Sequence, residues 1–234
     1  MGLDHLPGAL TISLEPTFEV RDRCGLSTST RNMIRKIWPF QLPNMDPETL
    51  AKLVFCFEND PERSDGIISG AQDSIGICMP GLVRHWYNNR FWPEKIESCH
   101  DEDVLCWLEE HLCMIPMFPR RPGCSVVDGK DITKPKVEAL AHAAEDCWNA
   151  ILAMDLDRFA AAYKASFDAQ VAMFPAMIQP GVEEYIDKYG SMDGVLAWKM
   201  PGAGGGGYLA LVCRDRSCFP EGAIELHIRR RGTL

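Results

Sequence analysis

The stretch that stands out in the sequence is residues 201–208, which read Pro-Gly-Ala-Gly-Gly-Gly-Gly-Tyr. Apolar runs at residues 195–200 and 208–213 flank it, and each is predicted to be a short buried strand. A glycine run between strands can be a flexible tether, or it can let backbone N–H groups approach a phosphate or another loop closely. Tethers usually carry Ser or Thr in polar surroundings, so the flanking strands favour a tight functional loop.

A second candidate anion site is the hydroxyl-rich segment at residues 24–30, Cys-Gly-Leu-Ser-Thr-Ser-Thr, which leads into a predicted helix at residues 31–38. A helix start offers unpaired N–H donors and a positive dipole end, and the hydroxyls can donate to phosphate or ligate Mg²⁺. The same residues also fit an ordinary Ser/Thr helix cap with no ligand. The local sequence does not separate these two interpretations.

Two carboxylates further along the chain, those of Glu58 and Asp73, are candidate functional groups. Glu58 ends a helix predicted from Asp46, its cap, and Pro47 near its start. Asp73 follows Gly70 and opens an apolar stretch. By pattern alone, Glu58 is an exposed carboxylate at a helix end, and Asp73 is a helix cap.

These segments, taken in order, resemble the motifs of the GHMP kinases, the superfamily of galactokinase, homoserine kinase, mevalonate kinase and phosphomevalonate kinase. Residues 199–208 resemble its C-terminal glycine motif, and the nearest branch is the sugar kinases that act on heptose or fucose. Residues 25–30 resemble its Gly-Leu-x-Ser-Ser motif, and residues 69–73 resemble its Gly-x-x-Asp-Gln segment. The hydroxyl loop, the helix ending in Glu58, the Gln-Asp pair and the glycine loop also follow the family's order.

The resemblance implies an α+β, GHMP kinase-like two-domain fold. A truncated ribosomal-protein-S5-like, ATP-binding part would cover residues 1–104, and a ferredoxin-like C-terminal domain would cover residues 105–234. The implied activity is transfer of the γ-phosphoryl group of ATP, with Mg²⁺, to a hydroxyl of a small-molecule sugar or sugar derivative. It also implies a cytoplasmic enzyme and allows a homodimer.

The resemblance assigns roles to individual residues. It gives the catalytic base role to Asp73, and Mg²⁺ to Ser29 and Glu58. Lys199 is a neighbour of the glycine loop. The residues implied in ATP binding are Gly25, Leu26, Ser27, Thr28, Ser29, Thr30, Gly204, Gly205 and Gly206.

The front of the chain departs from the family. Members normally begin with a Pro-Gly-Arg-x-x-x-x-Gly-Glu-His-x-Asp signature that helps bind the acceptor, and nothing upstream of Gly25 matches it. We therefore expect a chain shorter than a typical member, with the missing part at its front. The alternative to an active kinase is a non-catalytic or truncated GHMP-like protein that binds a nucleotide or another small ligand.

Composition narrows the function classes. The 234 residues are 46% hydrophobic, enough for a substantial core, and the net charge of −9 argues against nucleic-acid binding. No apolar run reaches the roughly 18 to 20 residues that span a bilayer, and the N-terminus lacks a secretory signal pattern. The ten cysteines show no Cys-x-x-Cys spacing, which favours reduced thiols over a zinc site or a disulfide framework.

The remaining patterns predict helices and antiparallel strands, as expected of an α+β fold. The aromatic residues at 85–93 are interpreted as packing residues, and residues 99–101 as a surface loop. Helices are predicted at residues 136–153 and 156–174, with a short one near residues 182–186. Strands are predicted within residues 9–21, at residues 107–116 before a basic turn at Arg120, and at residues 224–228.

Overall fold

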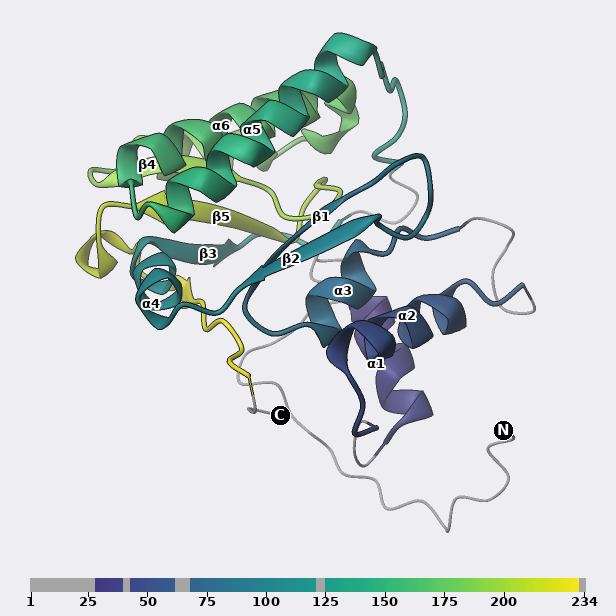
Figure 1. Ribbon diagram of the computed structural model, residues 1–234. Coiled ribbons are helices and arrows are strands. Elements are labelled where there is room, and N and C mark those ends of the chain that lie inside the picture. Colours follow the sequence, from purple (N-terminus) through teal and green to yellow (C-terminus); the bar gives the residue numbers. More distant parts are fainter. Residues whose placement is uncertain (1–27, 40–42, 62–67, 121–124, 232–234) are drawn as a thin grey trace. The chain divides into compact units, whose positions relative to one another are not determined.

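The computed structural model of the chain describes residues 28–39, 43–61, 68–120 and 125–231 (Figure 1). The described residues up to Met79 form one compact unit, and those from Pro80 onward form a second. The strands predicted at residues 9–21 lie outside the described residues. The domain boundary inferred at residues 104/105 stays a prediction.

Unit 1 consists of helices α1 (Thr28–Ile37), α2 (Pro47–Glu58) and α3 (Gln72–Cys78). Helix α2 begins as predicted, because the Asp46 carboxylate accepts a hydrogen bond from the Thr49 N–H at 2.9 Å. The three helices contact one another. The buried apolar residues of this unit are Ile34, Leu50, Ala51, Val54, Ala71, Ile75 and Cys78.

Unit 2 is built on a four-stranded antiparallel sheet in the order β4-β5-β3-β6. Its strands are β4 (Val195–Lys199), β5 (Tyr208–Cys213), β3 (Leu112–Pro116) and β6 (Ile224–Glu225). A separate hairpin pairs β1 (Leu82–Trp86) with β2 (Lys95–Cys99). All six residues of β5 are buried, because this inner strand has neighbours on both edges and side chains packed on both faces.

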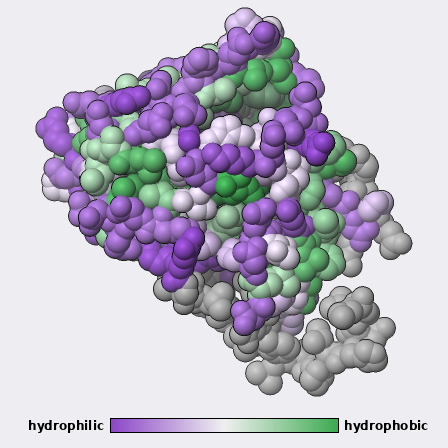
Figure 2. All heavy atoms as spheres, viewed as in Figure 1, coloured by the Kyte–Doolittle hydropathy of each residue, from purple (hydrophilic) through white to green (hydrophobic). Residues whose placement is uncertain are grey.

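Helices cover both faces of this sheet. The helices of unit 2 are α4 (Glu102–His111), α5 (Lys134–Leu152), α6 (Leu156–Met173) and α7 (Val182–Gly190). Helices α5 and α6 lie side by side over one face (Figure 1), where their buried residues pack with α4 against Ala197 and Val212. The other face carries a second core cluster, in which Val182 and Tyr189 of α7 pack with Leu209 and Leu211. Hydrophilic residues predominate over the outer helical layer in the view of Figure 2.

The strand predicted at residues 107–116 is wrong in its first half. Residues up to His111 belong to α4, and only Leu112–Pro116 forms β3. The Asp101 carboxylate caps α4 by accepting from the N–H groups of Asp103 and Val104. This cap starts a helix whose apolar side chains face the core, and a short apolar run does not distinguish a helix from a strand.

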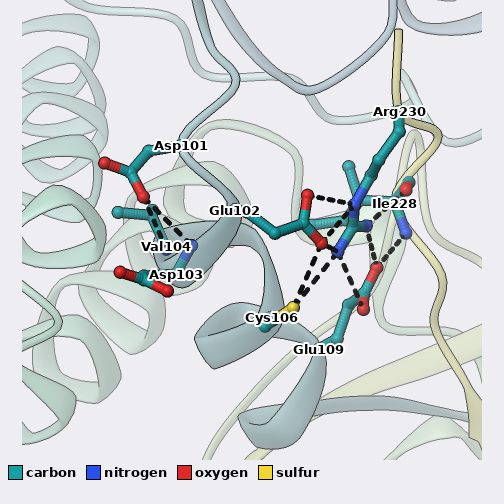
Figure 3. Close-up of polar contacts among 8 residues, drawn as sticks. All are labelled: Asp101, Glu102, Asp103, Val104, Cys106, Glu109, Ile228 and Arg230. Atoms are coloured by element: carbon teal, nitrogen blue, oxygen red, sulfur yellow. Dashed lines mark hydrogen bonds and ion pairs between the residues drawn. The ribbon is translucent and has the colours of Figure 1, made fainter. Parts of the chain in front are cut away.

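The chain beyond β6 is held by a cluster of side chains that we call the C-terminal clasp: Glu102, Glu109, Ile228 and Arg230 (Figure 3). The Arg230 guanidinium forms an ion pair with Glu102 at 2.8 Å and a shorter one with Glu109. The Ile228 N–H donates to Glu109 Oε1 at 2.6 Å. The predicted strand at residues 224–228 is therefore confirmed only at Ile224 and Glu225. Beyond Glu225, the Glu102 and Glu109 side chains of α4 hold the chain.

We expect the substitution Glu109→Gln to destabilise unit 2 by about 1–3 kcal/mol at pH 7, because it removes charge-assisted hydrogen bonds from a site only 7% exposed. Burial alone raises the pKa of Glu109, but the hydrogen bonds from Arg230 and the Ile228 N–H outweigh it and hold the pKa below its ordinary 4.5. A depressed pKa contributes stability that is present above pH 4.5 and is lost as the pH falls through the folded value. The difference from wild type, measured by denaturant unfolding, should therefore narrow in acid. The exposed neighbour Glu110 offers the control Glu110→Gln, and an equal effect of both substitutions would contradict the prediction.

Among the described residues, no helix is long and apolar enough to cross a membrane. The eight cysteines of that part of the chain are free thiols. Three or more His, Cys, Asp or Glu side chains are nowhere grouped there as a metal site would require.

Candidate functional site

Unit 1 brings together one hydroxyl and two carboxylates from three helices. Thr30 of α1 is fully buried, and its Oγ1 donates a hydrogen bond to Glu58 Oε1 at the end of α2, at 2.7 Å. Asp73 lies in the first turn of α3, close enough for its charge to act on Glu58. We call Thr30, Glu58 and Asp73 the carboxylate cluster.

Asn59 ties the end of α2 to the segment that leads into α3. Its side-chain amide accepts from the Ser69 N–H at 2.6 Å and donates to the Ser69 carbonyl at 3.3 Å. The same amide nitrogen donates to the Phe55 carbonyl at 2.9 Å, inside the last turn of α2. Because Asn59 adjoins Glu58, this bridge fixes the chain that leads to Asp73 beside the Glu58 carboxylate.

The electrostatics of the cluster are those of a site short of positive charge. Burial raises the pKa of Glu58, the Thr30 hydroxyl lowers it, and the Asp73 carboxylate raises it again, so the pKa lies above its ordinary 4.5. Glu58 Oε2 is buried and has no hydrogen-bond partner among the residues that the structure describes. A buried carboxylate oxygen without a partner is unfavourable, and a bound cation would relieve both the missing contact and the repulsion.

The cluster fits Mg²⁺ carried by a phosphate ligand. Mg²⁺ in such sites is held by one or two carboxylates, with water and phosphate oxygens completing the coordination. Glu58 offers an unpartnered oxygen, and Asp73 supplies a second carboxylate close by. The described residues lack a third acidic, His or Cys ligand at this place, so an all-protein metal cage does not fit them.

We expect Glu58→Gln to raise the midpoint of thermal unfolding at pH 7 by roughly 1–3 °C. A pKa raised above the unfolded value means that the ionised form is disfavoured in the folded chain, so Glu58 opposes stability as the pH rises above 4.5. Gln removes the charge but keeps an acceptor for Thr30. The gain should disappear at about pH 4, where Glu58 is protonated in the wild type. A lower midpoint at pH 7 would contradict the prediction.

In unit 2, residues 202–207 form the loop between β4 and β5. Gly204 to Gly207 are buried and have positive φ angles. At Gly206, with φ +135°, an added Cβ would lie 2.7 Å from the Phe118 carbonyl oxygen. The loop packs here directly against another backbone segment, and only glycine permits that approach.

Hydrogen bonds hold this glycine loop. The Gly205 N–H donates to the Met177 carbonyl at 2.9 Å, and the Gly207 N–H donates to the Phe118 carbonyl at 2.8 Å. The Arg120 Nε donates to the Gly204 carbonyl, also at 2.9 Å. The loop is therefore tight and is not a flexible tether, as its sequence context predicts.

A half-buried lysine supports the same loop through a glutamine side chain. Gln170 Nε2 donates to the Gly202 carbonyl at 3.1 Å, and the Lys199 ammonium donates to Gln170 Oε1 at 2.7 Å and to Ser166 Oγ at 2.9 Å. Burial lowers the pKa of Lys199 to about 8. Lys199 thus reaches the glycine loop through Gln170.

The predicted site residues fall into three groups. Thr30, Glu58 and Asp73 are brought together in unit 1, and Gly204, Gly205 and Gly206 lie in the glycine loop of unit 2. Thr28 and Ser29 begin α1, where the structure describes the backbone alone. Gly25, Leu26 and Ser27 lie outside the described residues. The roles assigned to all of them stay predictions.

Asp73 does not have the helix-cap position that its local pattern favours. Ala71 occupies the cap of α3, and Asp73 is the second residue of the helix. Its carboxylate is therefore not used as the cap of α3 and is available to the carboxylate cluster.

Sequence reasoning missed three residues that shape these sites: Asn59, Arg120 and Gln170. Arg120 did stand out as part of a predicted basic turn, but its contact lies 84 residues away in the chain. Asn59 follows Glu58 at a polar helix exit, which is a weak signal for a bridge. Gln170 carries no sequence signal of its contact with Gly202.

No protein-family model and no curated protein sequence matches the chain. Crystal structures that are similar to it in fold include a sugar kinase and a mevalonate kinase. A Campylobacter jejuni protein assigned as a sugar kinase superposes with a TM-score of 0.55 at 17% identity, over 90% of this chain and 62% of that one. A mevalonate kinase superposes with a TM-score of 0.50 at 14% identity, over 91% of this chain and 68% of that one.

These likenesses show that the chain has an α+β, GHMP kinase-like fold, as its motifs predict. The chain spans about 62% of the length of the sugar kinase structure. At these identities the likeness extends to the fold, and activity is a separate matter.

Proposed function

We propose that this protein is an ATP-dependent small-molecule kinase that transfers the γ-phosphoryl group to a hydroxyl of a sugar or sugar derivative. The observation that carries the proposal is the carboxylate cluster on a GHMP kinase-like fold, in which Glu58 Oε2 is buried without a hydrogen-bond partner among the described residues and the charge of Asp73 acts on Glu58. Phosphoryl transfer needs few protein groups, mainly donors and a metal for the phosphates and a group for the hydroxyl proton.

In this proposal Asp73, Glu58 and Thr30 of unit 1 have separate roles. Asp73 accepts or orients the proton of the attacking hydroxyl. Glu58 and the hydroxyl of Ser29 would hold Mg²⁺, and Thr30 keeps the Glu58 carboxylate in place through its 2.7 Å hydrogen bond. Bound Mg²⁺ would supply positive charge to the phosphate oxygens. The first N–H groups of α1, which begins at Thr28, would donate to the same phosphates.

We propose that the glycine loop contributes a fixed backbone shape. The N–H groups of Gly205 and Gly207 already donate to carbonyls within unit 2, so these two donors are not available to a nucleotide. The absence of side chains at Gly204, Gly205 and Gly206 lets the loop pack closely on Met177, Arg120 and Phe118. Arg120 and Gln170 fix this shape by holding the carbonyls of Gly204 and Gly202.

The test is ATP binding followed by turnover. We expect ATP with Mg²⁺ to stabilise the full chain, by about 2.7 kcal/mol at 100 times the Kd, and ATP without Mg²⁺ to stabilise it less. A panel of hexoses, heptoses and deoxyhexoses is then screened for ADP release. No stabilisation by ATP would overturn the proposal. Stabilisation without turnover of any acceptor would favour the non-catalytic, nucleotide-binding alternative.

A further inference from the structure

An open cavity of about 750 Å³ lies in unit 2 between α6, α7 and β4. Its volume is within the range of about 300–1,000 Å³ that is typical of small-molecule sites. The residues that hold the glycine loop, Arg120, Gln170 and Lys199, do not line it. Its apolar lining consists of Phe167, Val171, Ala172, Ile178, Ile186 and Trp198.

The Trp198 ring is the organising feature of this cavity. One side of the ring packs so closely on Gly190 of α7 that an added Cβ there would lie 2.8 Å from the ring. The Lys164 ammonium lies 5.3 Å from the ring centroid, within the range of a cation–π contact. A cation of the chain itself thus already lies over the aromatic ring that lines the cavity.

The charged groups of the cavity are mostly acidic. Three carboxylates, Asp168, Glu183 and Asp187, line it together with the single ammonium of Lys164. Lys164 forms an ion pair with Asp168 one turn further along α6. Glu183 and Asp187 lie one turn apart on α7, and neither forms an ion pair with another described residue. This leaves two uncompensated negative charges beside an apolar cavity.

We propose that the cavity binds a small primary amine that carries an aromatic or branched aliphatic body. The apolar body would pack on Phe167, Ile178 and Ile186, which removes apolar surface from water. The ammonium group would lie near the carboxylates of Glu183 and Asp187. This ligand class follows from the combination of apolar lining, aromatic ring and excess negative charge. The site is separate from the proposed kinase chemistry.

The test compares three probes with similar bodies: 2-phenylethylamine, 2-phenylethanol and 3-phenylpropionate. Each is titrated into the ¹⁵N-labelled full chain without nucleotide, and the indole N–H signal of Trp198 is followed, after assignment with Trp198→Phe. We expect a saturable shift with the amine, weaker binding of the alcohol and no binding of the carboxylate. Because nucleotide is absent, the result is independent of whether the protein is a kinase.

Substitutions on α7 isolate the role of charge. The double variant Glu183→Gln, Asp187→Asn should weaken amine binding by about three- to tenfold, as expected for two solvent-exposed charge contacts, and leave alcohol binding unchanged. Glu184→Gln is the matched control, because Glu184 is an exposed residue of the same helix that does not line the cavity.

Several outcomes would overturn the inference. They are the absence of a saturable shift with the amine, equal affinity for amine and alcohol, or an unchanged amine affinity in the double variant. A dimer in sedimentation experiments whose formation is blocked by Trp198→Ala would also overturn it, because a second copy of the chain would then occupy the cavity. Gly190→Ala provides a further variant. Its added methyl group must displace the Trp198 ring and should weaken amine binding without removing either carboxylate.

Discussion

Replacing Asp73 with Asn should lower kcat for phosphoryl transfer by at least about 100-fold, because a positioned proton acceptor contributes about 10²–10⁴-fold. Asn has nearly the same shape as Asp, so α3 should fold unchanged, but its amide does not accept the hydroxyl proton. Burial is the main cause of the raised pKa of Glu58, and the substitution removes the smaller contribution of the Asp73 charge. Glu58 is then more readily ionised, and binding of ATP with Mg²⁺ should persist. Steady-state turnover and ATP-dependent thermal stabilisation measure the two quantities separately.

The control for this experiment is Asp46→Asn, which removes a carboxylate elsewhere in unit 1. Asp46 caps α2 through the Thr49 N–H, and Asn is an equally good cap. Its turnover should match the wild type. A kcat of Asp73→Asn within about threefold of wild type would remove Asp73 from the mechanism and leave the GHMP kinase-like fold unaffected.

The second large effect is expected at Gly206. Ala at this position would need a φ of +135°, which L residues rarely adopt, and its Cβ would lie 2.7 Å from the Phe118 carbonyl oxygen and 3.0 Å from the Arg120 nitrogen. Both neighbours are backbone atoms, so neither moves aside by a change of rotamer. We expect Gly206→Ala to lower the free energy of unfolding of unit 2 by about 3 kcal/mol or more.

Gly222 provides a matched control for the strain that a positive φ angle imposes on alanine. Its φ is +79°, and an added Cβ meets nothing within 4 Å. Gly222→Ala therefore carries the strain of a positive φ without the clash, about 1–2 kcal/mol. Denaturant unfolding of both variants separates the two contributions. Equal destabilisation would show that the close approach to residues 118–120 does not matter.

Local sequence signals predicted most of the helices and strands. Asp46 and Pro47 mark the start of α2, and the apolar runs beside the glycine loop form β4 and β5. These signals succeed because a cap, or a short apolar run bounded by Gly or Pro, acts over a few residues. The prediction failed at residues 107–111, where the run Leu-Cys-Met-Ile continues directly from a helix without a break.

The sequence predicted individual residues of the candidate site but not the contacts between them. Motif order pointed to Glu58 and Asp73 as the carboxylates that matter, and the structure does bring them together in unit 1. The sequence did not indicate that the Thr30 hydroxyl, 28 residues from Glu58, would donate to it. It also did not indicate Asn59 as the residue that ties the end of α2 to Ser69.

The amino-acid sequence alone predicted which residues would serve phosphate binding, metal binding and proton transfer, and it determined the α+β character of the chain, because residue type and periodicity are local properties. Only the tertiary structure decided which oxygen of Glu58 lacks a partner, that Arg120 and Gln170 hold the glycine loop, and that α6, α7 and β4 enclose a cavity with excess negative charge. Those features depend on contacts between residues far apart in the chain. Such contacts arise from the packing of whole helices and strands, and a short window of sequence does not specify them.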